Sequence, residues 1–152
     1  EYIFGILKIC SKDSVLEVGC GAGMLARFIA KQCDYTGTDK SPTLINKHKQ
    51  ILNNKVLISE ANTLSFQNKI FDKTFVYGVF LYFPDINYAK RVLFELERVT
   101  RKAVFIGDIP HKSFRKVHLI FQRSMFNNYK IIEGGLYGYN RESRFNAILH
   151  LT

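Results

Sequence analysis

The chain has 152 residues, a hydrophobic fraction of 47% and a formal net charge of +9 at pH 7. This length predicts a single domain, residues 1–152, with room for a real core. No apolar run of about 18 residues occurs, which excludes a transmembrane helix. The three cysteines form no C-x-x-C pair and the four histidines show no ligand spacing. We therefore expect reduced thiols, a cytoplasmic protein and no metal site.

The net charge and the distribution of the basic residues favour different partners. A net charge of +9 suits a nucleic-acid partner. The basic residues are scattered, however, with modest clusters only around residues 98–102 and 112–116. Basic side chains also favour helix C-termini, where they remain solvated. We favour that reading and keep nucleic acid as the less favoured partner.

The most informative segment is residues 15–23, Val-Leu-Glu-Val-Gly-Cys-Gly-Ala-Gly. Its apolar start is typical of a buried strand, and good helix formers follow at residues 24–30. Glycines between a strand and a helix bring bare backbone N–H groups to a ligand. A dinucleotide loop would need a third glycine where Met24 stands, and no Gly-Lys-Ser/Thr follows for a Walker loop.

The G-x-G-x-G spacing, preceded two residues earlier by an acid, closely resembles the cofactor loop of class I S-adenosylmethionine-dependent methyltransferases. The resemblance implies that S-adenosylmethionine is the cofactor and that this segment contacts it through Glu17, Gly19, Cys20, Gly21 and Gly23. Relatives usually carry additional N-terminal residues. We therefore expect this methyltransferase domain to be truncated at its N-terminus.

A second short strand is predicted over residues 35–39, ending in an acid. Asp39 lies about 20 residues past the start of the glycine loop, where a parallel α/β site places its ribose carboxylate. A carboxylate can accept hydrogen bonds from both ribose hydroxyls. The alternative is a plain loop acid. Ser41 and Pro42 predict the start of a helix, and the resemblance adds Lys40 to the cofactor's surroundings.

A third strand, residues 56–58, precedes residues 59–66, which resemble the family's segment Gly-Asp-Ala-x-x-Leu-Pro-Phe. By that resemblance Glu60 accepts a hydrogen bond from the adenine amine. The backbone N–H of Ala61 binds a ring nitrogen, and Asn62 adjoins them. The alternative for Glu60 is a solvated acid on a surface loop.

A fourth strand is predicted to end at Tyr77, and residues 78–85 resemble the family's wall of the methyl-transfer site. Aromatic faces suit a sulfonium cation, which favours Tyr77 as a cofactor contact and as a catalytic residue. Tyr82 offers a second phenol there. The alternative is that these aromatic side chains belong to the core.

The rest of the chain continues the alternation of strands and helices. We predict a helix over residues 86–99 capped by Asp85, a strand over 103–106, and a basic, helix-compatible stretch from 110 to 123. Strands at 129–133 and 144–149 flank a turn-rich loop. Alternating strands and helices predict a parallel sheet covered on both faces.

The resemblance completes this fold class as a three-layer α/β sandwich with a mostly parallel, seven-stranded Rossmann-like sheet whose last strand is antiparallel. In such sheets ligands bind beyond the carboxyl ends of the strands. Five predicted residues fall at those ends: Gly19, Asp39, Glu60, Tyr77 and Asp108. The closing residues also resemble a bacterial subgroup of the family that modifies small molecules or surface glycans.

Methyl transfer from a sulfonium needs mainly orientation and exclusion of water, with a base only if the acceptor keeps its proton. His111 is our first candidate for that base, followed by Asp108 and His118. A loop histidine without function is the alternative.

Methyltransferases that act on exocyclic amines of nucleic acids carry an Asp/Asn-Pro-Pro-Tyr-like motif, and those that act on pyrimidine carbon use a cysteine near the fourth or fifth strand. This chain has neither feature. The resemblance therefore implies an O- or N-methyltransferase acting on a small molecule or glycan precursor. The alternatives are an RNA or protein methyltransferase and a cofactor-binding module without turnover. Oligomeric state stays open.

Overall fold

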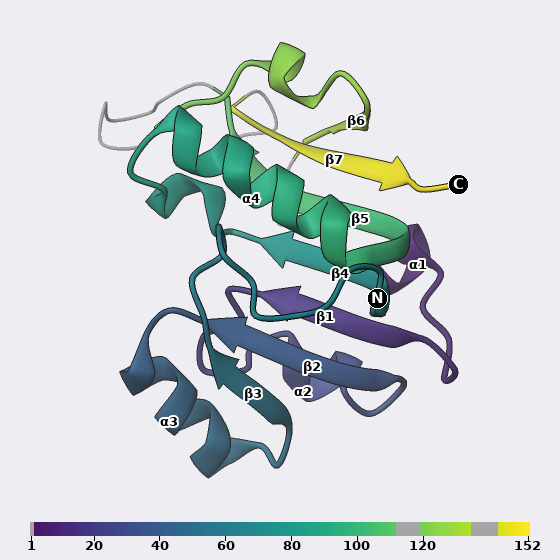
Figure 1. Cartoon of the computed structure of the whole chain (residues 1–152), viewed down its shortest axis with the longest axis vertical. Helices are drawn as coiled ribbons and strands as arrows, with labels where there is room; N and C mark the ends of the chain where they lie inside the picture. The colour runs from purple at the N-terminus through teal and green to yellow at the C-terminus, as the bar shows by residue number, and fades with distance from the viewer. Residues whose placement is uncertain (1, 112–118, 135–142) are drawn as a thin grey trace.

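The computed structural model describes residues 2–111, 119–134 and 143–152. These residues form a seven-stranded sheet in the order β3-β2-β1-β4-β5-β7-β6 (Figure 1). The strands are β1 (Ser14–Val18), β2 (Asp34–Asp39), β3 (Lys55–Ile58), β4 (Phe71–Tyr77), β5 (Thr100–Pro110), β6 (Lys130–Glu133) and β7 (Arg144–His150).

Strands β1 to β5 pair in parallel, whereas β7 runs antiparallel to both β5 and β6. This arrangement confirms the predicted mostly parallel seven-stranded sheet with an antiparallel last strand. The order reverses at β1, with β2 on one side and β4 on the other. Open parallel sheets bind ligands at such a switch point, beyond the carboxyl ends of the strands.

The described α-helices are α1 (Tyr2–Leu7), α2 (Ala26–Ile29), α3 (Pro42–Ile51) and α4 (Ile86–Val99), with 3₁₀ turns η1 (Phe80–Tyr82) and η2 (Arg123–Phe126). Helix α4 covers β4 and β5 on one face of the sheet (Figure 1). Helices α1, α2 and α3 contribute buried side chains to the core on the other face. The sheet therefore has helices on both faces, as the predicted three layers require.

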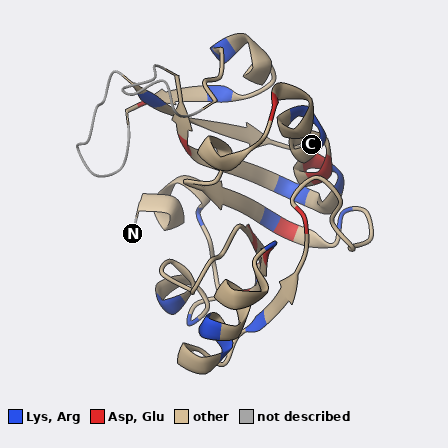
Figure 2. Cartoon of the chain, turned by 90° about the vertical axis from the view of Figure 1, so that its left-hand side faces the viewer, with Lys and Arg blue, Asp and Glu red and all other residues tan. Residues whose placement is uncertain are grey.

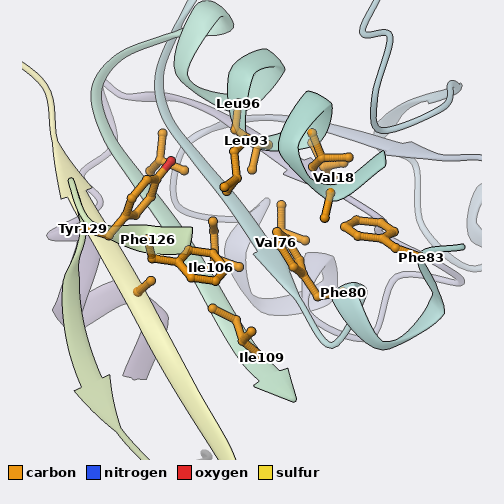
Figure 3. Close-up of a cluster of buried hydrophobic side chains, with 14 of the residues drawn as sticks. Val18, Val76, Phe80, Phe83, Leu93, Leu96, Ile106, Ile109, Phe126 and Tyr129 are labelled. Carbon is orange, nitrogen blue, oxygen red and sulfur yellow. The ribbon is translucent and has the colours of Figure 1, made fainter. Parts of the chain in front are cut away.

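Alternation along the central strands divides the core into these two faces. Val76 and Ile106 belong to the cluster beneath α4, together with Leu93 and Leu96 of that helix (Figure 3). Phe75, the neighbour of Val76 in β4, belongs to the cluster on the opposite face. Strands buried on both faces hold the carboxyl-end loops on a rigid base.

Both predicted helix caps are confirmed. Ser41 Oγ accepts a hydrogen bond from Leu44 N at 3.3 Å, and Asp85 Oδ1 accepts one from Tyr88 N at 2.7 Å. Each side chain satisfies a backbone N–H group that would otherwise lack a partner in the first turn of a helix. The caps begin α3 and α4 beside the ends of β2 and β4.

The predicted boundaries differ from the structure in three places. The helix expected over residues 24–30 is only α2, because the glycine loop continues to Leu25, which provides no side-chain cap. The strand expected over 103–106 extends over 100–110, with an irregular register between Ile106 and Ile109. Of the helix-compatible stretch, residues 112–118 lie outside the described residues, and 119–122 are not helical.

Basic residues are distributed over many elements, from α3 to η2, rather than along one strip (Figure 2). Within residues 2–111, 119–134 and 143–152, no helix has the length and apolar character needed to cross a bilayer.

Candidate functional site

A cavity of about 500 Å³ lies at the carboxyl ends of β1, β2, β3 and β4. Its walls come from the glycine loop, the end of β2, the loop after β3, residues 77–84 and Tyr88 of α4. Seven residues predicted from the sequence line it: Gly19, Gly21, Asp39, Lys40, Ala61, Tyr77 and Tyr82. The lining does not include the other predicted residues that the structure describes: Glu17, Cys20, Gly23, Glu60, Asn62, Asp108 and His111.

The glycine loop crosses the end of β2 and is held there by its own backbone. The N–H groups of Gly19 and Cys20 donate to Thr38 O at 2.7 and 2.9 Å. Gly21 has φ +53°, and a Cβ at this position would meet no protein atom within 4 Å. A Cβ on Gly23, at φ +94°, would lie 2.7 Å from Leu52 Cδ1. Gly23 is therefore needed for packing, whereas Gly21 leaves open space in the cavity wall.

Asp39 is oriented by backbone N–H groups. Its Oδ2 accepts from Gly21 N and its Oδ1 from Ser41 N, both at 2.9 Å. A carboxylate has about four lone-pair positions, so these two bonds leave acceptor capacity on each oxygen. The carboxylate is thus fixed in direction and can still accept hydrogen bonds from the hydroxyl groups of a ligand.

His48 of α3 supports the same loop and was not predicted from the sequence. Its side chain is fully buried, with Nδ1 3.2 Å from Gly21 O and Nε2 3.3 Å from Asn54 Nδ2. Because a carbonyl only accepts, Nδ1 carries the hydrogen and Nε2 accepts from the amide. His48 lies three positions after the apolar residue Ile45, and this spacing could have indicated that His48 is buried. No sequence signal links residue 48 to Gly21.

Glu17 and Cys20 lie beneath the loop. Tyr35 donates its hydroxyl hydrogen to Glu17 Oε2 at 2.6 Å, and burial raises the pKa of Glu17 to about 8. Burial also raises the pKa of the Cys20 thiol to about 12, which makes this thiol a poor nucleophile. Because Glu17 is buried beneath the glycine loop, it can support that loop.

Tyr88 is the second site residue that sequence reasoning missed. Its hydroxyl donates to Glu60 Oε2 at 2.6 Å. The backbone N–H groups of Ala61 and Asn62 lie near the same hydroxyl and act to lower its pKa. Burial and the Glu60 carboxylate raise the pKa of Tyr88 to about 12. A weak signal was present, because Tyr88 lies three residues after the predicted cap Asp85 and therefore in the first turn of α4.

Asp108 lies beside the wall formed by Gly78. Its Oδ2 is 4.0 Å from the position that a Cβ on Gly78 would take. The backbone adopts φ +60°, and its N–H donates to Asn146 Oδ1 at 2.9 Å. Burial raises the pKa of Asp108, while Arg144, with Nε 3.8 Å from Oδ1, opposes that shift. Asp108 is thus a carboxyl group with a raised pKa at the edge of the cavity.

His111 lies farther along the same strand end. Its Nδ1 is 3.0 Å from Phe121 O and therefore donates to that carbonyl, which leaves Nε2 as the nitrogen able to accept a proton. Its ring contacts the edge of Phe145. His118 lies outside the described residues.

Cation ligands do not gather at this site. Across the described ranges 2–111, 119–134 and 143–152, no group of three or more His, Cys, Asp and Glu side chains could hold a metal ion. The polar groups at the cavity are instead hydrogen-bond acceptors and backbone donors, which suit an organic ligand.

Comparison with known proteins defines the class to which this fold and site belong. A model of the family described as "Methyltransferase domain" matches residues 15–103. The chain belongs to this methyltransferase-domain family. Membership confirms the family and the enzyme class predicted from the sequence, and S-adenosylmethionine is the cofactor of that class.

Solved structures share the whole fold. An S-adenosylmethionine-dependent methyltransferase from Methanosarcina mazei has a TM-score of 0.83 at 14% identity, over 99% of this chain and 97% of that chain. Magnesium protoporphyrin IX methyltransferase from Synechocystis PCC 6803, with bound S-adenosylhomocysteine, has a TM-score of 0.79 at 12% identity, over 99% and 80%. At these identities the likeness concerns the fold.

A curated protein is more similar in sequence. The chain is 30% identical over 112 residues to the nonribosomal peptide synthetase asqK of Emericella nidulans. The match covers 66% of this chain and 4% of that protein. The chain therefore spans only a small part of this relative's length.

Proposed function

We propose that this domain binds S-adenosylmethionine in the cavity at the carboxyl ends of β1 to β4 and transfers its methyl group to an oxygen or nitrogen atom. The acceptor that we propose is a small molecule or a glycan precursor. The observation that carries the proposal is Asp39, a carboxylate held by neutral N–H groups beside the open backbone of Gly21.

Different residues at the cavity would each contact one part of S-adenosylmethionine. The main chain of Gly19 and the open space beside Gly21 would hold the amino-acid part, and Asp39 would accept hydrogen bonds from the ribose hydroxyls. Ala61 in the cavity lining, with its neighbours Glu60 and Asn62 just outside that lining, would bind the edge of the adenine. Tyr77 and Tyr82 would turn aromatic surface toward a sulfonium, which the ring quadrupole attracts. A 500 Å³ cavity falls within the range of small-ligand sites.

When bound, S-adenosylmethionine supplies a methyl group already activated on a positively charged sulfur, and transfer releases S-adenosylhomocysteine. The protein then has to align the acceptor and exclude water. An acceptor that keeps its proton needs a base. Asp108 is adjacent to the cavity wall, and His111 retains Nε2 as an acceptor. Either group would take the proton as the new bond to carbon forms.

The net charge of +9 favours a second candidate, in which the acceptor is RNA or a protein and the basic surface assists docking. Salt distinguishes the candidates, because contacts with phosphate make affinity for nucleic acid fall steeply as ionic strength rises. We expect a weak, flat response to salt. A steep decline in RNA affinity between about 50 and 200 mM salt would favour the second candidate.

Calorimetry with S-adenosylmethionine and S-adenosylhomocysteine tests cofactor binding, and transfer of a labelled methyl group to an acceptor panel tests activity. We expect both ligands to bind and label to appear on a hydroxyl or amine. Binding without turnover on any acceptor would support a module that only binds the cofactor. No binding of either ligand would refute the proposal.

The three cysteines are free thiols, which supports a cytoplasmic protein as a further part of the proposal.

A further inference from the structure

The hydroxyl of Tyr88 faces a carboxylate and two backbone N–H groups at one edge of the cavity. It donates to Glu60 Oε2 at 2.6 Å, and the N–H groups of Ala61 and Asn62 lie close enough to oppose the rise in its pKa. Its ring packs on Phe83, with ring centroids 5.0 Å apart, and the cap at Asp85 fixes the helical turn that carries it. Tyr88 and Ala61 both line the cavity.

A carboxylate oxygen beside backbone N–H groups also offers the partners that an adenine edge needs. The 6-amino group of adenine is a donor and the adjacent ring nitrogen N1 is an acceptor. Under the proposed function Asp39 holds the ribose at the end of β2. The base then lies toward the neighbouring strand β3, which leads into Ser59, Glu60 and Ala61. Ser59 N donates to Asp39 O at 3.0 Å, so the two strand ends are directly joined.

Glu60 Oε2 and the N–H groups of Ala61 and Asn62 cannot contact the Tyr88 hydroxyl and an adenine base from the same directions at the same time. We propose that Tyr88 is an internal competitor for the adenine subsite, whose hydroxyl occupies the subsite in the empty protein and moves out when adenine enters. This inference rests on the proposed function, because it requires that the cavity binds an adenine nucleoside.

The exchange has a consequence for affinity. Each hydrogen bond gained by the base replaces one made by the phenol, so adenine binding gains less than it would in an open subsite. Because only the fraction of protein with Tyr88 displaced can bind, the apparent affinity falls in proportion to that fraction. Return of the phenol as adenine leaves also assists release of S-adenosylhomocysteine, which keeps the adenine of the cofactor.

Substitution of Tyr88 by Phe tests this role, because Phe keeps the ring against Phe83 and lacks the hydroxyl. Calorimetry with S-adenosylhomocysteine should show about threefold to tenfold tighter binding, the scale of one hydrogen bond. Stopped-flow dissociation should be slower by a similar factor. A residue that only supported the fold, or that contacted the ligand, would give weaker binding when truncated.

Tyr129→Phe is the matched control. Tyr129 also donates to a carboxylate belonging to α4, Glu97 Oε1, at 2.9 Å, but it does not line the cavity. Its substitution should leave the affinity for S-adenosylhomocysteine unchanged while removing the same kind of bond.

Unchanged or weaker binding by Tyr88→Phe, with normal binding by the wild type, would overturn the competitor role alone. Failure of both proteins to bind would overturn the proposed function and this inference with it.

Discussion

Carboxylates at the two ends of the sheet have different kinds of partners. At the amino ends of β1 and β4, Asp13 contacts Lys73 Nζ at 2.6 Å, and Asp72 contacts Lys102 Nζ at 3.0 Å and Arg101 Nη2 at 3.1 Å. Blue and red bands lie on neighbouring strands there in Figure 2. At the carboxyl ends, Asp39 is bound by backbone N–H groups and Glu60 by a phenol.

The difference separates groups that stabilise the fold from groups available to a ligand. Burial alone would raise the pKa of Asp72, but hydrogen bonds from Ser14 and Lys102 and the charge of Arg101 hold it well below its usual value. A carboxylate neutralised in this way has little capacity left for a partner. Neutral N–H groups orient Asp39 without cancelling its charge, which is the state that ribose hydroxyls require.

The largest expected effect is on cofactor affinity in Gly21→Val, which tests whether the space beside Gly21 belongs to the ligand. In Gly21→Val the side chain enters open space in the cavity wall, so S-adenosylmethionine binding should fall more than about 100-fold. The loss of stability should be only about 1–2 kcal/mol, from the positive φ. Calorimetry and chemical unfolding measure the two quantities. Gly5→Val is the control, since a Cβ on Gly5 also meets nothing within 4 Å but lies in α1. Retained affinity in Gly21→Val would contradict the loop's role.

A pair of matched substitutions tests the two ends directly. Asp39→Ala should weaken S-adenosylmethionine binding by about 1.5–3 kcal/mol, the scale of charged hydrogen bonds. Asp72→Ala should instead lower the free energy of unfolding by about 1–3 kcal/mol and leave the dissociation constant unchanged. The cost to stability at Asp72 should be full above about pH 4 and should shrink as pH falls from there toward the lowered pKa of the folded carboxyl, because a depressed pKa stabilises the fold until that carboxyl is itself protonated.

If Asp39→Ala leaves affinity intact, the ribose assignment is wrong. If Asp72→Ala weakens binding as much as Asp39→Ala, the separation between the two ends fails.

Glu17 extends the comparison beneath the glycine loop. Because its pKa is raised to about 8, the folded protein holds a proton that the unfolded chain releases near pH 4.5. Stability due to this group is therefore greatest below pH 4.5 and decreases as pH rises toward 8. Glu17→Gln should remove about 2 kcal/mol of the difference in unfolding free energy between pH 6 and pH 8.

Chemical unfolding at both pH values measures that difference, and an unaltered pH dependence in Glu17→Gln would show that Glu17 is ionised in the folded protein. Tyr35→Phe removes the partner hydroxyl and keeps the titrating group. Because the Tyr35 hydrogen bond lowers the pKa of Glu17, its loss should keep or steepen the fall in stability between pH 6 and pH 8 and lower stability at both pH values.

Local patterns in the sequence predicted much of the fold correctly. The apolar run before Gly19, the cap at Ser41 and the cap at Asp85 each depend on residues within a few positions of one another. The same locality explains the errors. Good helix formers at residues 24–30 predicted a longer helix than α2. Helix propensity belongs to single residues and does not indicate where the glycine loop ends.

The missed residues all act over long separations. His48 contacts Gly21 across 27 positions, Tyr88 contacts Glu60 across 28, and Asn146 supports Asp108 across 38. None of them carries a spacing signal toward its partner, since chain order does not show which loops meet above the sheet.

The amino-acid sequence by itself determined the strand-and-helix alternation, the glycine turn and the acid at the end of β2, because hydrophobic periodicity, capping and glycine backbone freedom act between near neighbours. Only the tertiary structure decided which polar groups share hydrogen bonds. The parallel sheet brings distant loops to its carboxyl edge, where Asp39 keeps acceptor capacity and Tyr88 donates to Glu60. At the opposite, amino edge it places Asp72 among cationic side chains.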